Sequence, residues 1–230
     1  MIPPTTDLNA KSLAARMKQA AEQGDGDAFV ALAHELAVCA TQPGMADAAH
    51  RLMGLTQKAA VHRIQEVAQL LIRAGTSASR PYMVMAAALE AAAPLEPGVA
   101  RFMANRQQAK KVLQAALAAV PDTEAMSQKL RIRLARILWQ MGNEEGLSHL
   151  VAEVAARARE GGHDHAELAK LAFMCMDSRH GSALREAVRI AVEREPDSAE
   201  VLRAHVRGLV ADRQPIEAWW PRLKQATVNH

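Results

Sequence analysis

The chain has 230 residues, of which half are apolar and 23% are charged, so it can bury a core and lacks the composition of a disordered protein. Aromatic residues make up only 3%, which favours helices packed on helices over a sheet core rich in aromatic and β-branched side chains. The net charge of +3 is too small to argue for nucleic acid by itself. No signal peptide and no apolar run of membrane length is evident. We therefore expect a cytoplasmic protein without a membrane span.

Apolar residues recur with helical spacing nearly throughout, as in the stripe formed by Phe29, Leu32, Ala33 and Leu36. We predict an all-α chain of about 10–12 helices. A flexible tail is expected over 1–7, followed by a divergent half over 8–120. In that half, helix pairs are predicted near 8–40 and 61–93. The intervening stretch 45–58 and a longer helix near 98–119 do not fall into register with these pairs.

The half from 121 to 227 divides more regularly into helix pairs. Pairs are predicted to open at Asp122, near His163 and at Asp197, with Asp122 and Asp197 as N-caps. Glycines that follow apolar stripes are expected to end helices in the left-handed conformation. These glycines are Gly24, Gly75 and Gly142.

Four short segments resemble signatures of the tetratricopeptide repeat (TPR) family. Met141–Leu147 (MGNEEGL) is similar to the turn between the two helices of a repeat, and Gln23–Ala28 resembles another such turn. Arg194–Ser198 (REPDS) and Ala119–Asp122 (AVPD) resemble repeat boundaries. The resemblance implies one continuous right-handed solenoid of stacked antiparallel helix pairs, in which the first helix of each pair lines a concave groove.

No arrangement of residues typical of catalysis or metal binding is evident. His163 and His165 flank Asp164 at a predicted helix start, where they point to different sides and Asp164 serves as a cap. His34-Glu35 begins like the zinc motif HExxH, but Val38 occupies the second histidine position. Cys39 and Cys175 are isolated and are expected to be reduced and buried. We predict no enzyme activity, no cofactor and no metal site.

A basic stretch from Arg101 to Arg136 contains eight basic residues against two acidic ones. Arg106 and Lys110 are spaced to share a face of one predicted helix. Lys129, Arg133 and Arg136 are spaced to share a face of the next helix. These five residues are candidates for binding a partner, and the alternative is an ordinary solvated face.

Trp219 and Trp220 are adjacent and precede Pro221, and these residues are predicted to close the last helix of the chain. Neighbouring residues on a helix point about 100° apart, so both indoles cannot enter one core site. We expect one to pack inward and the other to be half exposed. The exposed ring is a candidate for a capping contact or for docking a partner.

The favoured interpretation is a non-catalytic scaffold or adaptor that binds a protein or peptide partner, including an acidic one, on its curved surface. One alternative is the assembly region of a larger multidomain enzyme, such as a bacterial glycosyltransferase, or of a secretion component. A second alternative is nucleic-acid binding through 101–136. The scarcity of aromatic side chains for base stacking argues against that alternative. The pattern does not predict an oligomeric state.

Overall fold

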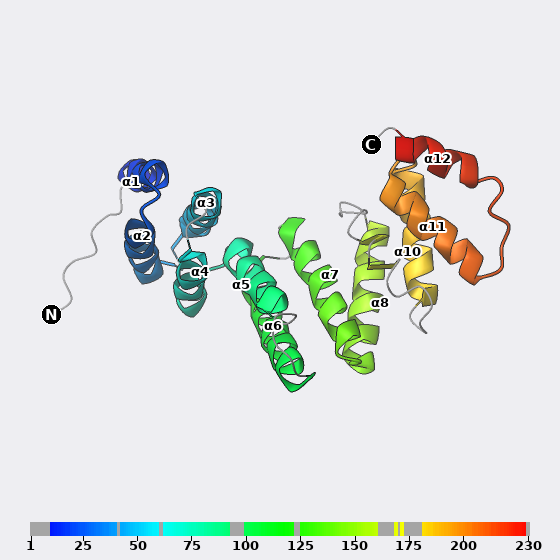
Figure 1. The fold of residues 1–230 in the computed structure, drawn as a ribbon, viewed down its shortest axis with the longest axis horizontal. Helices are drawn as coiled ribbons and strands as arrows, with labels where there is room; N and C mark the ends of the chain where they lie inside the picture. Colours follow the sequence, from blue (N-terminus) through cyan, green and yellow to red (C-terminus); the bar gives the residue numbers. More distant parts are fainter. Residues whose placement is uncertain are drawn as a thin grey trace. The chain divides into compact units, whose positions relative to one another are not determined.

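The computed structural model describes residues 10–40, 42–59, 62–92, 99–121, 125–160, 168–169, 171–172 and 181–228. This described part forms eleven helices and contains no strand (Figure 1), so the all-α prediction is confirmed. The predicted tail over 1–7, the cap at Asp122 and the His163–His165 segment lie outside the described residues. The chain divides into two compact units, residues 1–121 and 122–230.

The first unit contains six helices. They are α1 (Ala10–Gln23), α2 (Gly26–Val38), α3 (Met45–Lys58), α4 (Ile64–Arg73), α5 (Ser79–Ala92) and α6 (Val99–Ala119). From α1 to α3, each helix packs against both the next helix and the one after it, and α5 also packs on α4 and α6. In Figure 1, α1 and α3 accordingly lie along one side of this unit and α2 and α4 along the other.

The helix pairs predicted near 8–40 and 61–93 are both in contact, because α1 packs against α2 and α4 packs against α5. Sequence patterns left 45–58 and 98–119 outside the helix pairs, whereas α3 packs against α4 and α5 packs against α6. Helices α3 and α6 therefore pack on the expected pairs. The helices α1, α3 and α5 begin at residues 10, 45 and 79, which are 35 and 34 residues apart.

The core of the first unit is built from the helical stripes that the sequence predicted. Phe29, Leu32, Ala33 and Leu36 are all buried along α2. They form one cluster with buried residues of α1, α3 and α4, such as Met17 and Leu52. Full burial of a Leu or Phe side chain contributes roughly 1.5–3 kcal/mol, so these contacts dominate the cohesion of the unit.

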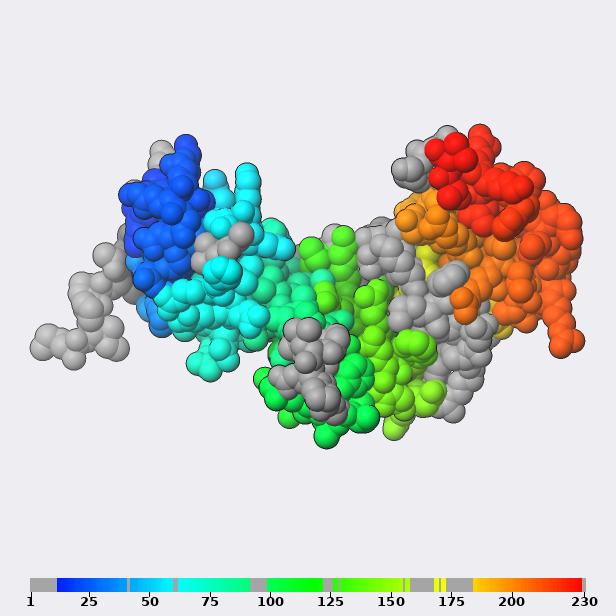
Figure 2. Space-filling model, viewed as in Figure 1, coloured from blue at the N-terminus to red at the C-terminus, as the bar shows by residue number. Residues whose placement is uncertain are grey.

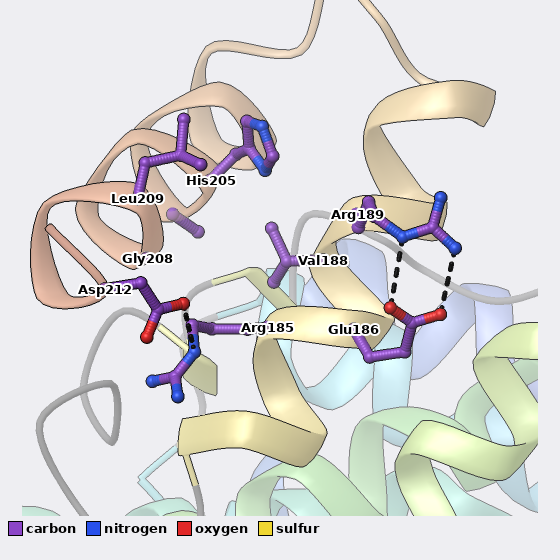
Figure 3. Close-up of a pocket in the computed structure, with 9 residues that line it drawn as sticks. Arg185, Glu186, Val188, Arg189, His205, Gly208, Leu209 and Asp212 are labelled. Atoms are coloured by element: carbon purple, nitrogen blue, oxygen red, sulfur yellow. Dashed lines mark hydrogen bonds and ion pairs between the residues drawn. The ribbon is translucent and has the colours of Figure 1, made fainter. Parts of the chain in front are cut away.

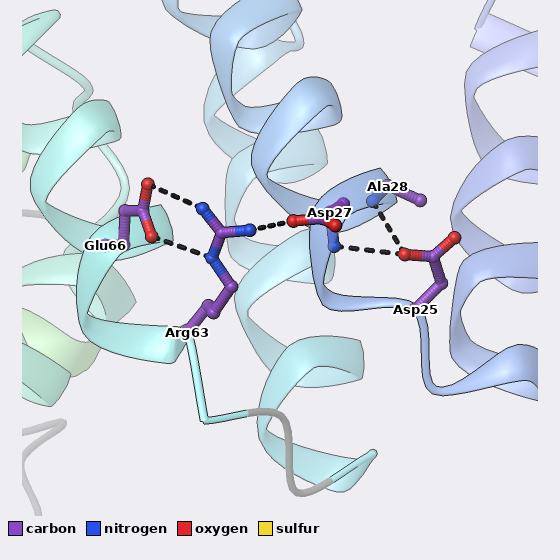
Figure 4. A network of polar contacts seen from close by, with 5 residues as sticks. All are labelled: Asp25, Asp27, Ala28, Arg63 and Glu66. Carbon is purple, nitrogen blue, oxygen red and sulfur yellow. Dashed lines mark hydrogen bonds and ion pairs between the residues drawn. The ribbon is translucent and has the colours of Figure 1, made fainter.

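Polar contacts on the surface join neighbouring helices of the first unit. Asp25 is the N-cap of α2, and its carboxylate accepts hydrogen bonds from the backbone N–H groups of Asp27 and Ala28 at 3.0 and 3.1 Å. Arg63 donates to Asp27 and also, from Nε at 2.8 Å, to Glu66 (Figure 4). Arg63 thereby links the starts of α2 and α4. Because these side chains are exposed, such ion pairs stabilise the fold only slightly.

The second unit contains five described helices. They are α7 (Ala125–Gln140), α8 (Glu144–Glu160), α10 (Gly181–Arg194), α11 (Ala199–Ala211) and α12 (Trp220–Val228). Contacts link α7 to α8, α8 to α10, α10 to α11 and α11 to α12. Figure 2 shows α12, in red, on the surface of this unit.

The helix ends agree with most of the predicted turns. Gly24, Gly75 and Gly142 have φ values of 62°, 76° and 64°, which confirms their left-handed conformation. The predicted cap at Asp197 was wrong. The N-cap of α11 is Ser198, whose hydroxyl accepts from the N–H of Val201 at 3.5 Å, because α11 begins at Ala199, one residue later than the pattern indicated.

Candidate binding surfaces

Arg106 differs most from its predicted role. It is only 6% exposed and lies on the buried face of α6 with Ala109, Leu113 and Ala116. Its guanidinium stacks on the Phe102 ring at 4.6 Å, and its Nε and Nη1 atoms have no hydrogen-bond partner among the described residues. The solvated-face alternative is therefore wrong for Arg106. Its neighbour Lys110, one turn later, is half-buried.

The other basic candidates belong to α7 in the second unit. Lys129, Arg133 and Arg136 are all half-buried on this helix rather than fully solvated. Arg131, between them, is buried at 4% exposure and donates to Glu153 at 2.6 Å and to Ser127 at 3.0 Å. Part of the positive charge of the basic stretch is thus buried and paired with an acidic residue inside the protein. That the α7 candidates share a common face with Arg106 and Lys110 stays a prediction.

The tryptophan pair behaves as expected, although its position along the helix does not. Trp219 is half-buried and meets the His205 ring edge-on, with ring centroids 4.4 Å apart. Trp220 is 47% exposed and lies 5.7 Å from the Lys224 ammonium. The pair was expected to close the last helix, but Trp220 begins α12, and Pro221 is tolerated there because it lies in the first turn.

A pocket of about 300 Å³ lies between α10 and α11 (Figure 3), and one of its lining residues, His205, contacts Trp219. Val188, Ala204, Gly208 and Leu209 supply its apolar lining. At one end the Nε atom of Arg185 pairs with Asp212 at 2.8 Å. Arg189 is held by Glu186 and Glu193 at 2.9 and 2.7 Å. The charged groups of the pocket are therefore already paired within the protein.

His205 lines the same pocket, two turns before Asp212 on α11. Burial lowers the pKa of its imidazole below the ordinary value of 6.5, and the nearby positive charges of Arg222 and Arg189 lower it further. Arg222 lies 4.9 Å from the Trp219 ring. The imidazole is consequently neutral at pH 7, and the pocket gains no charge from it there.

A larger groove, of about 580 Å³, lies between α1 and α3 in the first unit. Sequence reasoning missed it. Its lining combines half-buried Ala14, Ala21, Leu55 and Ala59 with the exposed polar residues Lys18, Glu22, Arg51 and Lys58. The small residues of α1 and the basic residues of α3 are visible in the sequence. They predict a groove only when α1 and α3 are known to be neighbours.

The rim of the α1–α3 groove carries three basic side chains and one acidic one. Lys18 pairs with Glu22 at 3.7 Å, so these two charges offset each other. Arg51 and Lys58 make no hydrogen bond or ion pair with any residue that the structure describes. The groove therefore offers a floor of small apolar side chains beside two cations available to a ligand.

Neither a metal-binding cluster nor a membrane-spanning helix is found among the residues that the structure describes. Within the described ranges, no three His, Cys, Asp or Glu side chains are grouped so that they could hold a metal ion. Across those ranges no helix combines the length and apolar character needed to cross a bilayer. Cys39 is buried as predicted, and burial raises the pKa of its thiol. Cys175 lies outside the described residues.

Comparison of the chain with protein-family models, with curated proteins and with solved structures finds no match.

Proposed function

We propose that this protein is a non-catalytic TPR-like scaffold that binds a peptide segment of a partner protein in the α1–α3 groove. The groove, with its small apolar floor and its available cations, is the observation that carries this proposal. Peptide-binding grooves of helical proteins combine an apolar floor with a polar rim in the same way. The proposal concerns protein partners and includes no catalytic step.

Two observations support the TPR-like architecture. The helices α1, α3 and α5 begin 35 and 34 residues apart, close to the period of about 34 residues of TPR proteins. Helices joined by short turns run antiparallel, so α1 and α3 run in the same direction along one side of the stack. This is the position of the first helices of successive repeats, which line the concave groove in that family.

The burial of Arg106 and Arg131 bears on the nucleic-acid alternative. Both guanidiniums are covered, at 6% and 4% exposure, so neither presents its charge to a phosphate backbone at the surface. Non-specific binding to nucleic acid depends on the number of accessible cations. The basic stretch is therefore weaker as a nucleic-acid surface than its composition indicates.

The test is to fill the groove without changing charge. In Ala14→Gln/Ala21→Gln, two long side chains compatible with a helix occupy the floor. The matched control, Ala31→Gln/Ala104→Gln, places the same residues at exposed positions on α2 and α6. Affinity capture with mass spectrometry identifies partners of the wild type, and calorimetry on the purified partner measures its binding.

We expect the groove variant to lose the partner at least tenfold while the control retains it, with both melting temperatures near that of the wild type. If the groove variant retained every partner, the binding surface would lie elsewhere, first around Trp219 and Trp220.

A further inference from the structure

The two available cations of the α1–α3 groove have a defined spacing. Arg51, Leu55 and Lys58 lie at positions i, i+4 and i+7 of α3, and all three line the groove. Such positions share one helix face, and seven residues of helix span about 10.5 Å. The groove thus presents two positive side chains about two turns apart, with an apolar side chain between them.

This spacing discriminates between the conformations a ligand can have. In an extended segment, side chains on one face recur every second residue, at about 6.6 Å and then about 13 Å. Neither distance matches the two cations. In a helix lying along α3, residues i and i+7 share a face and have the same separation of about 10.5 Å.

The floor of the groove favours the same kind of ligand. Ala14, Ala21 and Ala59 have small side chains, and small residues allow a further helix to approach closely. A helix that offers carboxylates toward α3 and small apolar side chains toward the floor would complement both features. Lys18 and Glu22 on the opposite rim pair with each other, so they do not select for a charge on the ligand.

Resting on the proposed function, we infer that the α1–α3 groove binds an acidic amphipathic helix with carboxylates at positions i and i+7 and a small or medium apolar residue at i+4. Arg51 and Lys58 each bind one carboxylate, and Leu55 contacts the apolar residue. The ion pairs are exposed, so the two together contribute about five- to tenfold in affinity.

The experiment uses the full chain and labelled alanine-based peptides of about 20 residues, long enough to populate a helix. The first peptide carries Glu at i and i+7 and Leu at i+4. A second peptide has the same composition but places its glutamates at i and i+9, on opposite faces of the helix. A third replaces the glutamates of the first by Lys, and a fourth is an extended acidic peptide with proline residues. Binding is measured by fluorescence anisotropy at physiological salt.

The protein variants are Arg51→Glu/Lys58→Glu and the control Arg73→Glu/Lys111→Glu, which makes the same change in charge at exposed positions of α4 and α6. We expect the wild type and the control to bind the first peptide about five- to tenfold more tightly than the second. We expect the groove variant to lose this preference and to bind the Lys peptide instead. That exchange of specificity would not result from mere loss of folding.

Four outcomes would overturn the inference. Equal binding of the first two peptides would mean attraction by net charge alone, and preference for the extended peptide would contradict the helix. A change of molar mass in the groove variant, measured by sedimentation, would identify a second copy of the chain as the occupant. If no acidic peptide bound while groove filling still abolished partner capture, the acidic helix would be wrong and the proposed function would stand.

Discussion

His205 is the residue whose surroundings have the clearest energetic consequence. Its ring meets Trp219 edge-on at 4.4 Å, and the paired arginine Arg189 of α10 lines the same pocket. Arg222 stacks over the Trp219 ring at 4.9 Å. Protonation would place a third positive charge among the guanidiniums in a half-buried site. The folded state therefore favours the neutral imidazole.

We predict that acidification destabilises the second unit through His205. Its pKa in the folded state is lowered from 6.5, so the unfolded chain binds the proton more readily, and stability falls as pH drops below 6.5 toward the lowered value. The pKa itself is measurable by NMR of the imidazole. The melting temperature of His205→Gln should depend less on pH between 7.5 and 5 than that of the wild type. A measured pKa at or above 6.5 would contradict this account.

At the scale of elements, the α7–α8 turn shows how one segment ends a helix and begins the next. Gly142 has φ of 64°, which a residue with a Cβ adopts only with strain. Asn143 follows, and its side-chain oxygen accepts from the N–H of Gly146 at 3.0 Å, which satisfies a free donor at the start of α8. Leu138 and Leu147, on either side of the turn, are buried.

We predict that Gly142→Val lowers the free energy of unfolding by about 1–2 kcal/mol, because valine opposes positive φ. Gly146→Ala should change it much less. Alanine raises helix propensity, but its Cβ would lie 3.1 Å from Asn143 Oδ1 and 3.3 Å from Leu138 Cδ2, which offsets the gain. Urea denaturation of both variants provides the measurement. Equal losses would show that the turn is placed at the wrong residues.

At the scale of the whole molecule, the chain consists of two compact units that meet in sequence at Pro121 and Asp122. Each unit has its own buried residues, such as Phe29 and Leu52 in the first and Leu130, Leu184 and Leu202 in the second. A unit that carries its own core has the main requirement for folding alone. The two units are also of similar length.

We predict that fragments 1–121 and 122–230 each fold when expressed separately. Each should give a helical circular dichroism spectrum and a cooperative thermal transition, because the contacts that stabilise it are retained in the fragment. A fragment that is helical but melts without cooperativity would show that its core is completed only in the intact chain.

Much of the fold was predictable because it depends on short-range physics. The stripe Phe29, Leu32, Ala33 and Leu36 follows the period of the helix, so its burial could be predicted. Gly142 follows such a stripe, at a turn where a residue without a Cβ adopts a positive φ without steric strain. The wrong cap at Asp197 is also a short-range error, since the observed N-cap, Ser198, is the next residue.

The sequence by itself therefore determined the helices, their buried faces and most of their turns, whereas tertiary structure decided which faces meet. The sequence pattern predicts that Arg106 is a surface cation, yet the packing of α6 buries it. The α1–α3 groove combines Ala14 and Ala21 with Arg51 and Lys58. These residues are separated by two helix boundaries, and no local pattern couples them. The physical reason is that side-chain periodicity acts within one helix, while burial and grooves depend on the choice of neighbours.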